Sequence, residues 1–75
     1  MEESLNVRGL DCKEVGDKIV CEILPEKGEK RSIEVDTVEL KGFSLDEFPY
    51  REAYEKPVSC RIKRSGDVVK LICNR

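Results

Sequence analysis

Apolar and polar residues alternate on both sides of two short glycine-containing reversals, and this pattern most constrains what the chain can fold into. Alternation over a few residues is typical of a half-buried strand, and agreement between the two flanks of a tight reversal predicts a β-hairpin. Near the N-terminus, a two-residue loop at Gly16-Asp17 sets Cys12 directly opposite Cys21. The inward face of this hairpin then consists of Leu10, Cys12, Ile19, Cys21 and Ile23.

A second hairpin is predicted near the C-terminus, where two alternating runs flank Ser65-Gly66. A two-residue loop at these positions pairs Cys60 with Leu71. Because the side-chain period of a strand is two, this register fixes which residues look inward. The inward face consists of Val58, Cys60, Ile62, Val69, Leu71 and Cys73, and the outward face of Ser59, Arg61, Lys63 and Lys70.

A third strand is expected over residues 31–40, after a polar loop at residues 25–30 that begins with proline and contains a glycine. Its alternation changes parity at Thr37-Val38. The first strand changes parity at Gly9, where a β-bulge can re-aim the following side chains. Strands that bend in this way favour a sheet that curls towards closure.

The period changes between residues 43 and 57. The run Ser44-Leu45-Asp46-Glu47 matches a capping box, in which the first and fourth side chains hydrogen-bond to the start of a helix. Proline is well tolerated at the first position of a helix. We therefore expect a short helix from about Pro49 to Glu55.

The predicted order is three strands, a short helix and two strands (β-β-β-α-β-β) within one domain, residues 1–75. This order favours a mainly β fold: a small five-stranded antiparallel sheet, barrel-like or curled, of OB-like or SH3-like type. No apolar run approaches the ~20 residues needed to span a bilayer, so we expect no membrane association. The opening stretch is acidic and lacks an apolar core like that of a signal peptide, which predicts a cytoplasmic protein.

Positive charge is concentrated at the C-terminal end, where residues 56–75 carry six basic side chains and one acidic side chain. The predicted register sets Arg61 opposite Lys70, and like charges directly opposed destabilise a hairpin. An anionic ligand or the protein's own acidic strands would offset this repulsion. The candidate binding surface is therefore Arg61, Lys63, Arg64 and Lys70, with Tyr50 and Tyr54 as neighbours.

The four cysteines form no C-x-x-C motif, so the usual zinc-ribbon spacing is absent. The favoured interpretation is that they are reduced thiols packed in the core. A disulfide between Cys12 and Cys21 is the second interpretation, because directly opposed residues at a non-hydrogen-bonded site come within reach of a bridge. A metal site made by all four thiolates is the third.

The chain contains no histidine, which removes the most versatile proton shuttle near neutral pH. We therefore expect a non-enzymatic module that uses no cofactor or metal. Its abundant Glu and Lys and its lack of Gln are typical of heat-adapted intracellular proteins. The expected partner is another protein or a second copy of the chain. The alternatives are nucleic-acid binding through the basic hairpin and a thiol- or metal-dependent activity of the cysteines.

Overall fold

The computed structural model describes residues 2–42 and 57–75, which form one six-stranded sheet. No helix in this part of the chain is long and apolar enough to cross a membrane. The strands are β1 (Glu2–Val15), β2 (Lys18–Pro25), β3 (Arg31–Val35), β4 (Thr37–Lys41), β5 (Val58–Ser65) and β6 (Val68–Asn74).

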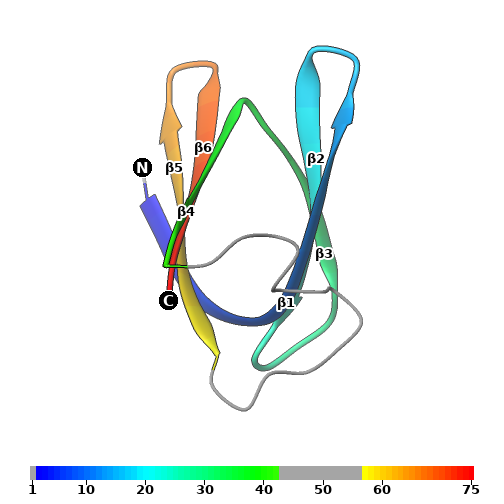
Figure 1. Cartoon of the computed structure of the whole chain (residues 1–75). Coiled ribbons are helices and arrows are strands. Elements are labelled where there is room, and N and C mark those ends of the chain that lie inside the picture. Colours follow the sequence, from blue (N-terminus) through cyan, green and yellow to red (C-terminus); the bar gives the residue numbers. More distant parts are fainter. Residues whose placement is uncertain (1, 43–56) are drawn as a thin grey trace.

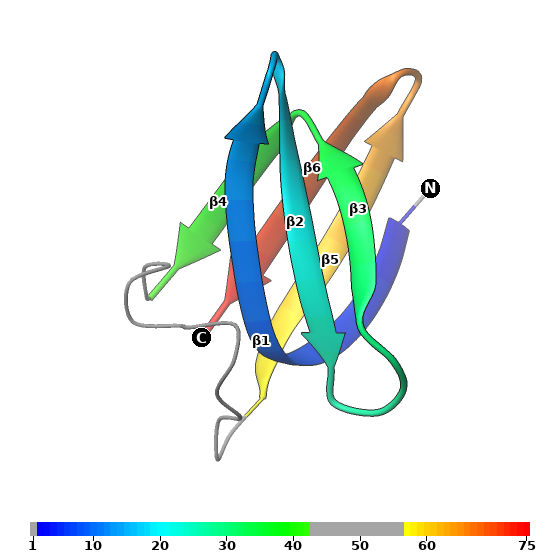
Figure 2. The same ribbon diagram turned by 90° about the vertical axis from the view of Figure 1, so that its right-hand side faces the viewer.

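The sheet has the order β3-β2-β1-β5-β6-β4 and curls into a half-barrel (Figure 1). Every pairing is antiparallel except that of β4 with β6, which is parallel. The first and last strands in this order, β3 and β4, are consecutive in the chain and are joined by Asp36 alone. The two hairpin reversals and this β3–β4 corner all lie at one end of the molecule (Figures 1 and 2).

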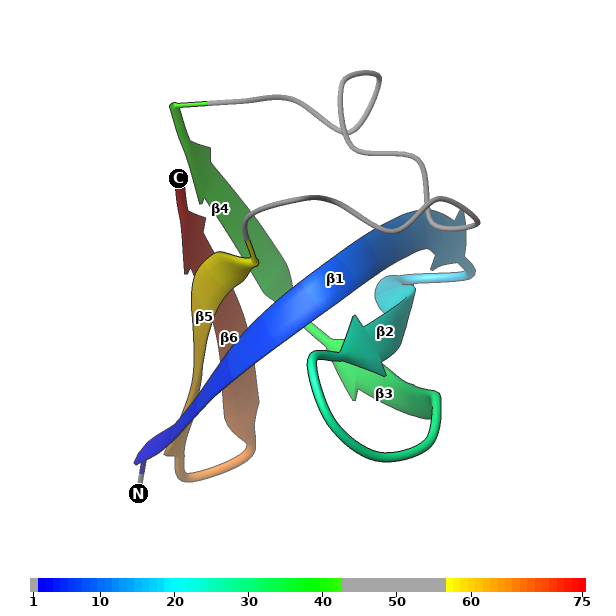
Figure 3. The same cartoon turned by 90° about the horizontal axis from the view of Figure 1, so that it is seen from below.

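The long strand β1 holds the two halves of the sheet together. Its residues 2–7 pair with β5 and its residues 7–15 pair with β2. The expected bulge is present, because the register with β2 shifts between Val7 and Gly9. The bulge lets both Val7 and Leu10 be buried although they are three residues apart. Figure 3 shows β1 running across from one half to the other.

The core lies on the concave side of the curled sheet. It consists of alternate residues from both halves, as the hairpin patterns predict. Among the residues that the structure describes, the side chains at the centre of this core are Val7, Leu10, Cys21, Ile23, Val35, Val58, Cys60, Ile62, Leu71 and Cys73. Leu5, Cys12, Ile19, Ile33, Val38, Leu40 and Val69 pack against them while partly exposed.

The first hairpin has the register expected from the sequence, with Cys12 opposite Cys21. The second reversal is one residue further along than predicted, at Gly66-Asp67. Both reversals thus place glycine first, with φ of +66° at Gly16 and +62° at Gly66, a region that favours glycine. Moving a reversal by one residue shifts the partner of each strand residue by two positions. Because the side-chain period of a strand is also two, the predicted inward faces stay the same.

The change of partners corrects two predictions for the second hairpin. Cys60 lies opposite Cys73 instead of Leu71, and Lys70 lies opposite Lys63 instead of Arg61. The first correction brings two cysteines into direct opposition. The second leaves a like-charge pair in the hairpin, but one residue pair closer to its reversal.

The predicted set of five antiparallel strands is wrong in two respects. The expected third strand divides at Asp36 into β3, which pairs with β2, and β4, which pairs with β6 on the other side of the sheet. The described residues therefore form six strands, and one of their pairings is parallel. The helix expected from about Pro49 to Glu55 lies outside the described residues.

Candidate functional site

The outward face of β5 and β6 carries three of the four basic residues that the sequence singles out. Arg61 and Lys63 alternate along β5, and Lys70 lies beside them on β6. Two acidic side chains flank this group from the neighbouring strands. Glu2 on β1 lies 3.5 Å from Arg61 (Oε1 to Nη1), and Glu39 on β4 lies 2.9 Å from Lys70 (Oε1 to Nζ).

These acids offset the repulsion between the basic side chains. The hydrogen bond and the charge of Lys70 hold the pKa of Glu39 below its ordinary value, and Lys41 and Lys63 act in the same direction. Arg64 is exposed and shares its strand parity with the buried Ile62, so it does not extend the outward row. Tyr50 and Tyr54 lie outside the described residues. The structure thus brings together Arg61, Lys63 and Lys70.

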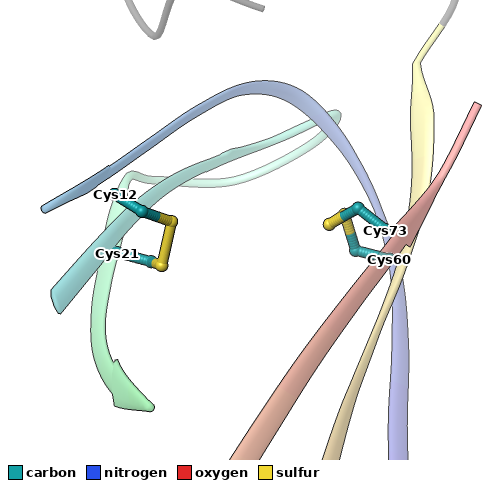
Figure 4. The surroundings of a disulfide bond; sticks show 4 residues. All are labelled: Cys12, Cys21, Cys60 and Cys73. Atoms are coloured by element: carbon teal, nitrogen blue, oxygen red, sulfur yellow. A yellow bond between two sulfur atoms is a disulfide. The ribbon is translucent and has the colours of Figure 1, made fainter. Parts of the chain in front are cut away.

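All four cysteines are joined in disulfides, Cys12 to Cys21 and Cys60 to Cys73. In each pair the Cα atoms are 4.0 Å apart, as suits directly opposed residues at a non-hydrogen-bonded site. Figure 4 shows both bridges on the inward side of their hairpins, with the sulfurs in the space between the two halves of the sheet. Each bridge therefore joins the two strands of its own hairpin.

The disulfides overturn the interpretation of the cysteines as reduced core thiols. They also overturn the tetrathiolate metal site, because a disulfide sulfur is not a thiolate ligand. Among the described residues, no group of three or more Cys, Asp or Glu side chains is placed to hold a metal ion. The second bridge was missed because it depends on the displaced reversal at Gly66-Asp67.

A feature that the sequence did not reveal is a seam between the two halves of the sheet. After the bulge, residues 9–15 of β1 pair with β2 on one side, and within 2–42 and 57–75 they have no strand on the other. In the same part of the chain, strand β4 also pairs on one side only, with β6. A groove of about 190 Å³ lies in the seam and is lined by Cys12, Lys13, Glu14, Ile19 and Val38.

The bulge also determines which backbone groups point into the seam. Since Cys12 and Cys21 form a non-hydrogen-bonded pair, the N–H and C=O of Cys12 point away from β2. The same holds for Leu10 and Glu14, because directions alternate along a strand. Before the bulge the parity is reversed, and the carbonyl of Asn6 accepts a hydrogen bond of 2.9 Å from the N–H of Glu26. Residues 10, 12 and 14 therefore offer a row of backbone donors and acceptors beside the groove.

Asp36 fastens the corner between β3 and β4 to both hairpins. Its backbone N–H donates to the carbonyl of Val69 at 2.8 Å, and its Oδ2 accepts the N–H of Val69 at 2.8 Å. Oδ1 forms an ion pair with Lys18 on β2. The hydrogen bond from Lys18, followed by that from Val69, holds the pKa of the Asp36 carboxyl below its ordinary value.

An ion pair between Glu3 on β1 and Arg31 on β3 also connects strands that are not neighbours in the sheet. Arg31 donates two hydrogen bonds to the carboxylate, of 2.8 Å from Nη1 and 3.3 Å from Nη2. These bonds lower the pKa of Glu3. Asp36 and Glu3 thus stabilise the curled sheet at two different places through ion pairs with Lys18 and Arg31. Both carboxyl groups act in their ionised form, as their lowered pKa values indicate.

Replacing Asp36 by asparagine is expected to lower stability at neutral pH and to flatten its dependence on pH in acid. Because the folded protein lowers the pKa of this carboxyl, its contribution is present above the ordinary carboxyl pKa and is lost as pH falls through the lowered value. Urea unfolding between about pH 5 and pH 2 measures this difference. The control Asp67→Asn, in an exposed reversal, should keep the wild-type midpoint at pH 7. An Asp36→Asn curve parallel to wild type throughout would contradict the assignment.

The fold and the seam define a small curled-sheet domain with one disulfide in each hairpin. No family model, curated protein or solved structure matches the chain.

Proposed function

We propose that this domain is a non-enzymatic protein-binding module that takes an extended segment of a partner along the free edge of β1, in the seam. One observation carries the proposal: among residues 2–42 and 57–75, the backbone groups of β1 that point away from β2 over residues 9–15 have no strand partner, and they lie directly beside a groove that includes Ile19 and Val38. Addition of a strand to an exposed sheet edge is a recurrent mode of peptide recognition. Main-chain hydrogen bonds supply affinity, and the groove selects the side chains that face it.

The architecture supports the proposal. If β3 and β4 are counted as one strand bent at Asp36, five strands follow one another in a ring from β3 through β2, β1, β5 and β6 back to β4. A partly open five-stranded barrel is the OB-type arrangement, and we propose that the domain belongs to this architecture. Within the described residues such a ring is open at the seam, since the pairing of β1 with β5 ends at Val7 and Val58.

The groove indicates the chemistry of the partner segment. Side chains of a strand added beside β1 alternate between the groove and solvent. Those that face the groove meet Cys12, Ile19 and Val38, so small apolar residues suit these positions. Lys13 and Glu14 at its margin carry opposite charges and favour a segment with little net charge. The expected partner segment therefore alternates small apolar residues with polar ones.

The basic outward face supports a direct role in binding less well than the seam does. Arg61 and Lys70 are already paired with Glu2 and Glu39 of the same chain. A nucleic-acid phosphate would have to displace these carboxylates. We retain cytoplasmic localisation as a proposal for a heat-adapted source, because intracellular proteins of hyperthermophiles are the known exception to the rarity of disulfides inside cells.

Selection from a randomised peptide library, followed by two variants at Glu14, tests the proposal. The N–H of Glu14 points into the seam, so Glu14→Pro removes one donor of the free edge without removing a bond to β2. Glu14→Thr changes the side chain and keeps the N–H. Selected peptides are expected to alternate apolar and polar residues and to bind the proline variant about tenfold more weakly than the threonine variant, by calorimetry.

Hydrogen exchange in the complex provides the positional check. Bound peptide should slow exchange of the amides of Leu10, Cys12 and Glu14 and leave Arg61, Lys63 and Lys70 unchanged. Equal affinity for the two Glu14 variants, or the absence of any binder in the library, would contradict the proposal. Two alternatives have their own signatures in the same samples. A second copy of the chain in the seam would give a dimer by light scattering, and salt-dependent binding of oligothymidine would indicate nucleic acid.

A further inference from the structure

The two disulfides differ in their access to solvent. Cys60, Cys73 and Cys21 are each 0% exposed. Cys12 is only partly buried and lines the groove in the seam together with Ile19 and Val38. Of the four cysteines, Cys12 is thus the one that lines a surface depression of about 190 Å³, large enough to admit a small molecule. The burial of Cys60 and Cys73 leaves no comparable route to the second bridge.

We propose that the Cys12–Cys21 disulfide is a thiol–disulfide exchange site, open to a small thiol through the groove, and that Cys60–Cys73 is closed to exchange in the folded protein. This inference does not depend on the proposed partner, because it needs only the groove. Exchange rates depend on access to the attacked sulfur as well as on the chemistry of the thiol. The groove supplies access to Cys12 and to no other cysteine.

The exchange proceeds in two balanced steps. The thiolate of the external thiol attacks Sγ of Cys12, the S–S bond breaks, and its electron pair leaves on Sγ of Cys21, which takes a proton from water. A mixed disulfide then joins Cys12 to the external sulfur. A second external thiolate attacks that external sulfur and releases Cys12 as a thiol. The net reaction converts one protein disulfide and two thiols into a protein dithiol and one external disulfide.

The surroundings of Cys12 determine which thiols suit the site. Lys13 and Glu14 both line the groove and carry opposite charges, so neither anionic nor cationic thiols are strongly favoured. Val38 and Ile19 make the remaining wall apolar. Small neutral thiols such as dithiothreitol and 2-mercaptoethanol therefore fit the site and are the probes of choice. Reduction would remove the covalent link between β1 and β2 beside the seam. The backbone hydrogen bonds between these two strands would remain.

Reduction of the native protein at a series of low urea concentrations tests the proposal. Samples are treated with dithiothreitol, quenched with an alkylating reagent and analysed by peptide mass spectrometry. Cys12 and Cys21 are expected to be labelled at a rate independent of urea and about a hundredfold or more faster than Cys60 and Cys73. The latter pair should follow the steep urea dependence of global unfolding, because only complete opening exposes it.

Substitutions in the groove wall link the reaction to the proposed route. Val38→Phe fills the groove and should slow reduction of Cys12–Cys21 about tenfold, whereas Val38→Ala should accelerate it. Val20→Phe, on the outward face of β2, is the matched control and should leave the rate unchanged. Continued protection of Cys60 and Cys73 in each sample shows that the variant is folded. The proposal is overturned if both bridges are reduced with the same urea dependence, or if neither Val38 variant changes the rate.

Discussion

Replacing Cys60 and Cys73 together by alanine is expected to lower the free energy of unfolding by about 4 kcal/mol. The bridge closes a loop with a sequence separation of 13, and in the chain-entropy account a loop of this size contributes about 3 kcal/mol. Both residues are 0% exposed, so losing the sulfurs also leaves the core underfilled. Domains of this size have about 4–11 kcal/mol of stability in all. The variant should therefore lie close to the threshold of unfolding, with a Tm about 20 °C lower.

Denaturant unfolding and calorimetry of both double variants measure this effect. The matched variant Cys12→Ala with Cys21→Ala removes a bridge with a sequence separation of 9, and one of its two residues, Cys12, is only partly buried. Its loss is expected to be smaller, about 2–3 kcal/mol. Wild type measured in reductant and denaturant should match the variant that lacks both bridges. An equal or larger loss of unfolding free energy for the Cys12–Cys21 variant would show that burial does not determine which disulfide stabilises the fold more.

The sequence predicted the inward faces of the hairpins more reliably than their partners. Alternation records only whether a residue looks inward or outward, so Cys60 and Leu71 were placed on the correct face. Alternation does not distinguish pairing registers that differ by two residues. At the second reversal, Ser65-Gly66 and Gly66-Asp67 both offer a glycine, and they differ in whether it comes first or second. The structure places it first at both hairpins, and this choice alone makes the Cys60–Cys73 bridge.

The division of the third strand could not be predicted from local pattern. The alternation changes parity near Thr37, and this change predicts a bend there. That the chain crosses from one side of the sheet to the other at Asp36 depends on contacts with residues distant in sequence, namely Val69 and Lys18. The same holds for the parallel pairing of β4 with β6, since no feature of a five-residue strand indicates its direction relative to a neighbour.

The candidate site shows the same limit. Arg61, Lys63 and Lys70 were found because charge stands out in a sequence, yet Glu2 and Glu39 offset them from strands that only the fold brings close. The free edge of β1 was missed although its cause, the bulge at Gly9, was expected. Alternation indicates where side chains point. Whether a strand edge is free depends on which strands pair. The pairings of β1 with β5 and of β4 with β6 join segments distant in sequence, so no short segment indicates them.

Replacing Leu71 by alanine is expected to lower the free energy of unfolding by about 3 kcal/mol, the second large effect. Leu71 is 0% exposed and lies opposite Ile62 on β5 and Val38 on β4. Removing three carbon atoms from such a position loses the transfer free energy and leaves a cavity that the surrounding structure only partly fills. The effect should extend to β4, because in the described part of the chain this edge strand has its only ladder with β6. Amide exchange in β4 is therefore expected to accelerate more than in β2.

Val68 supplies the control for Leu71, because it lies three residues away on the same strand and is 54% exposed. Val68→Ala should change stability by less than about 0.5 kcal/mol, since surface substitutions away from special features have little effect. Leu71→Met keeps most of the buried volume and should cost less than about 1.5 kcal/mol. Urea unfolding of the three variants orders them by buried volume lost. Comparable losses for Val68→Ala and Leu71→Ala would mean that β6 does not pack its inward face against β4 and β5, and the half-barrel itself would then be wrong.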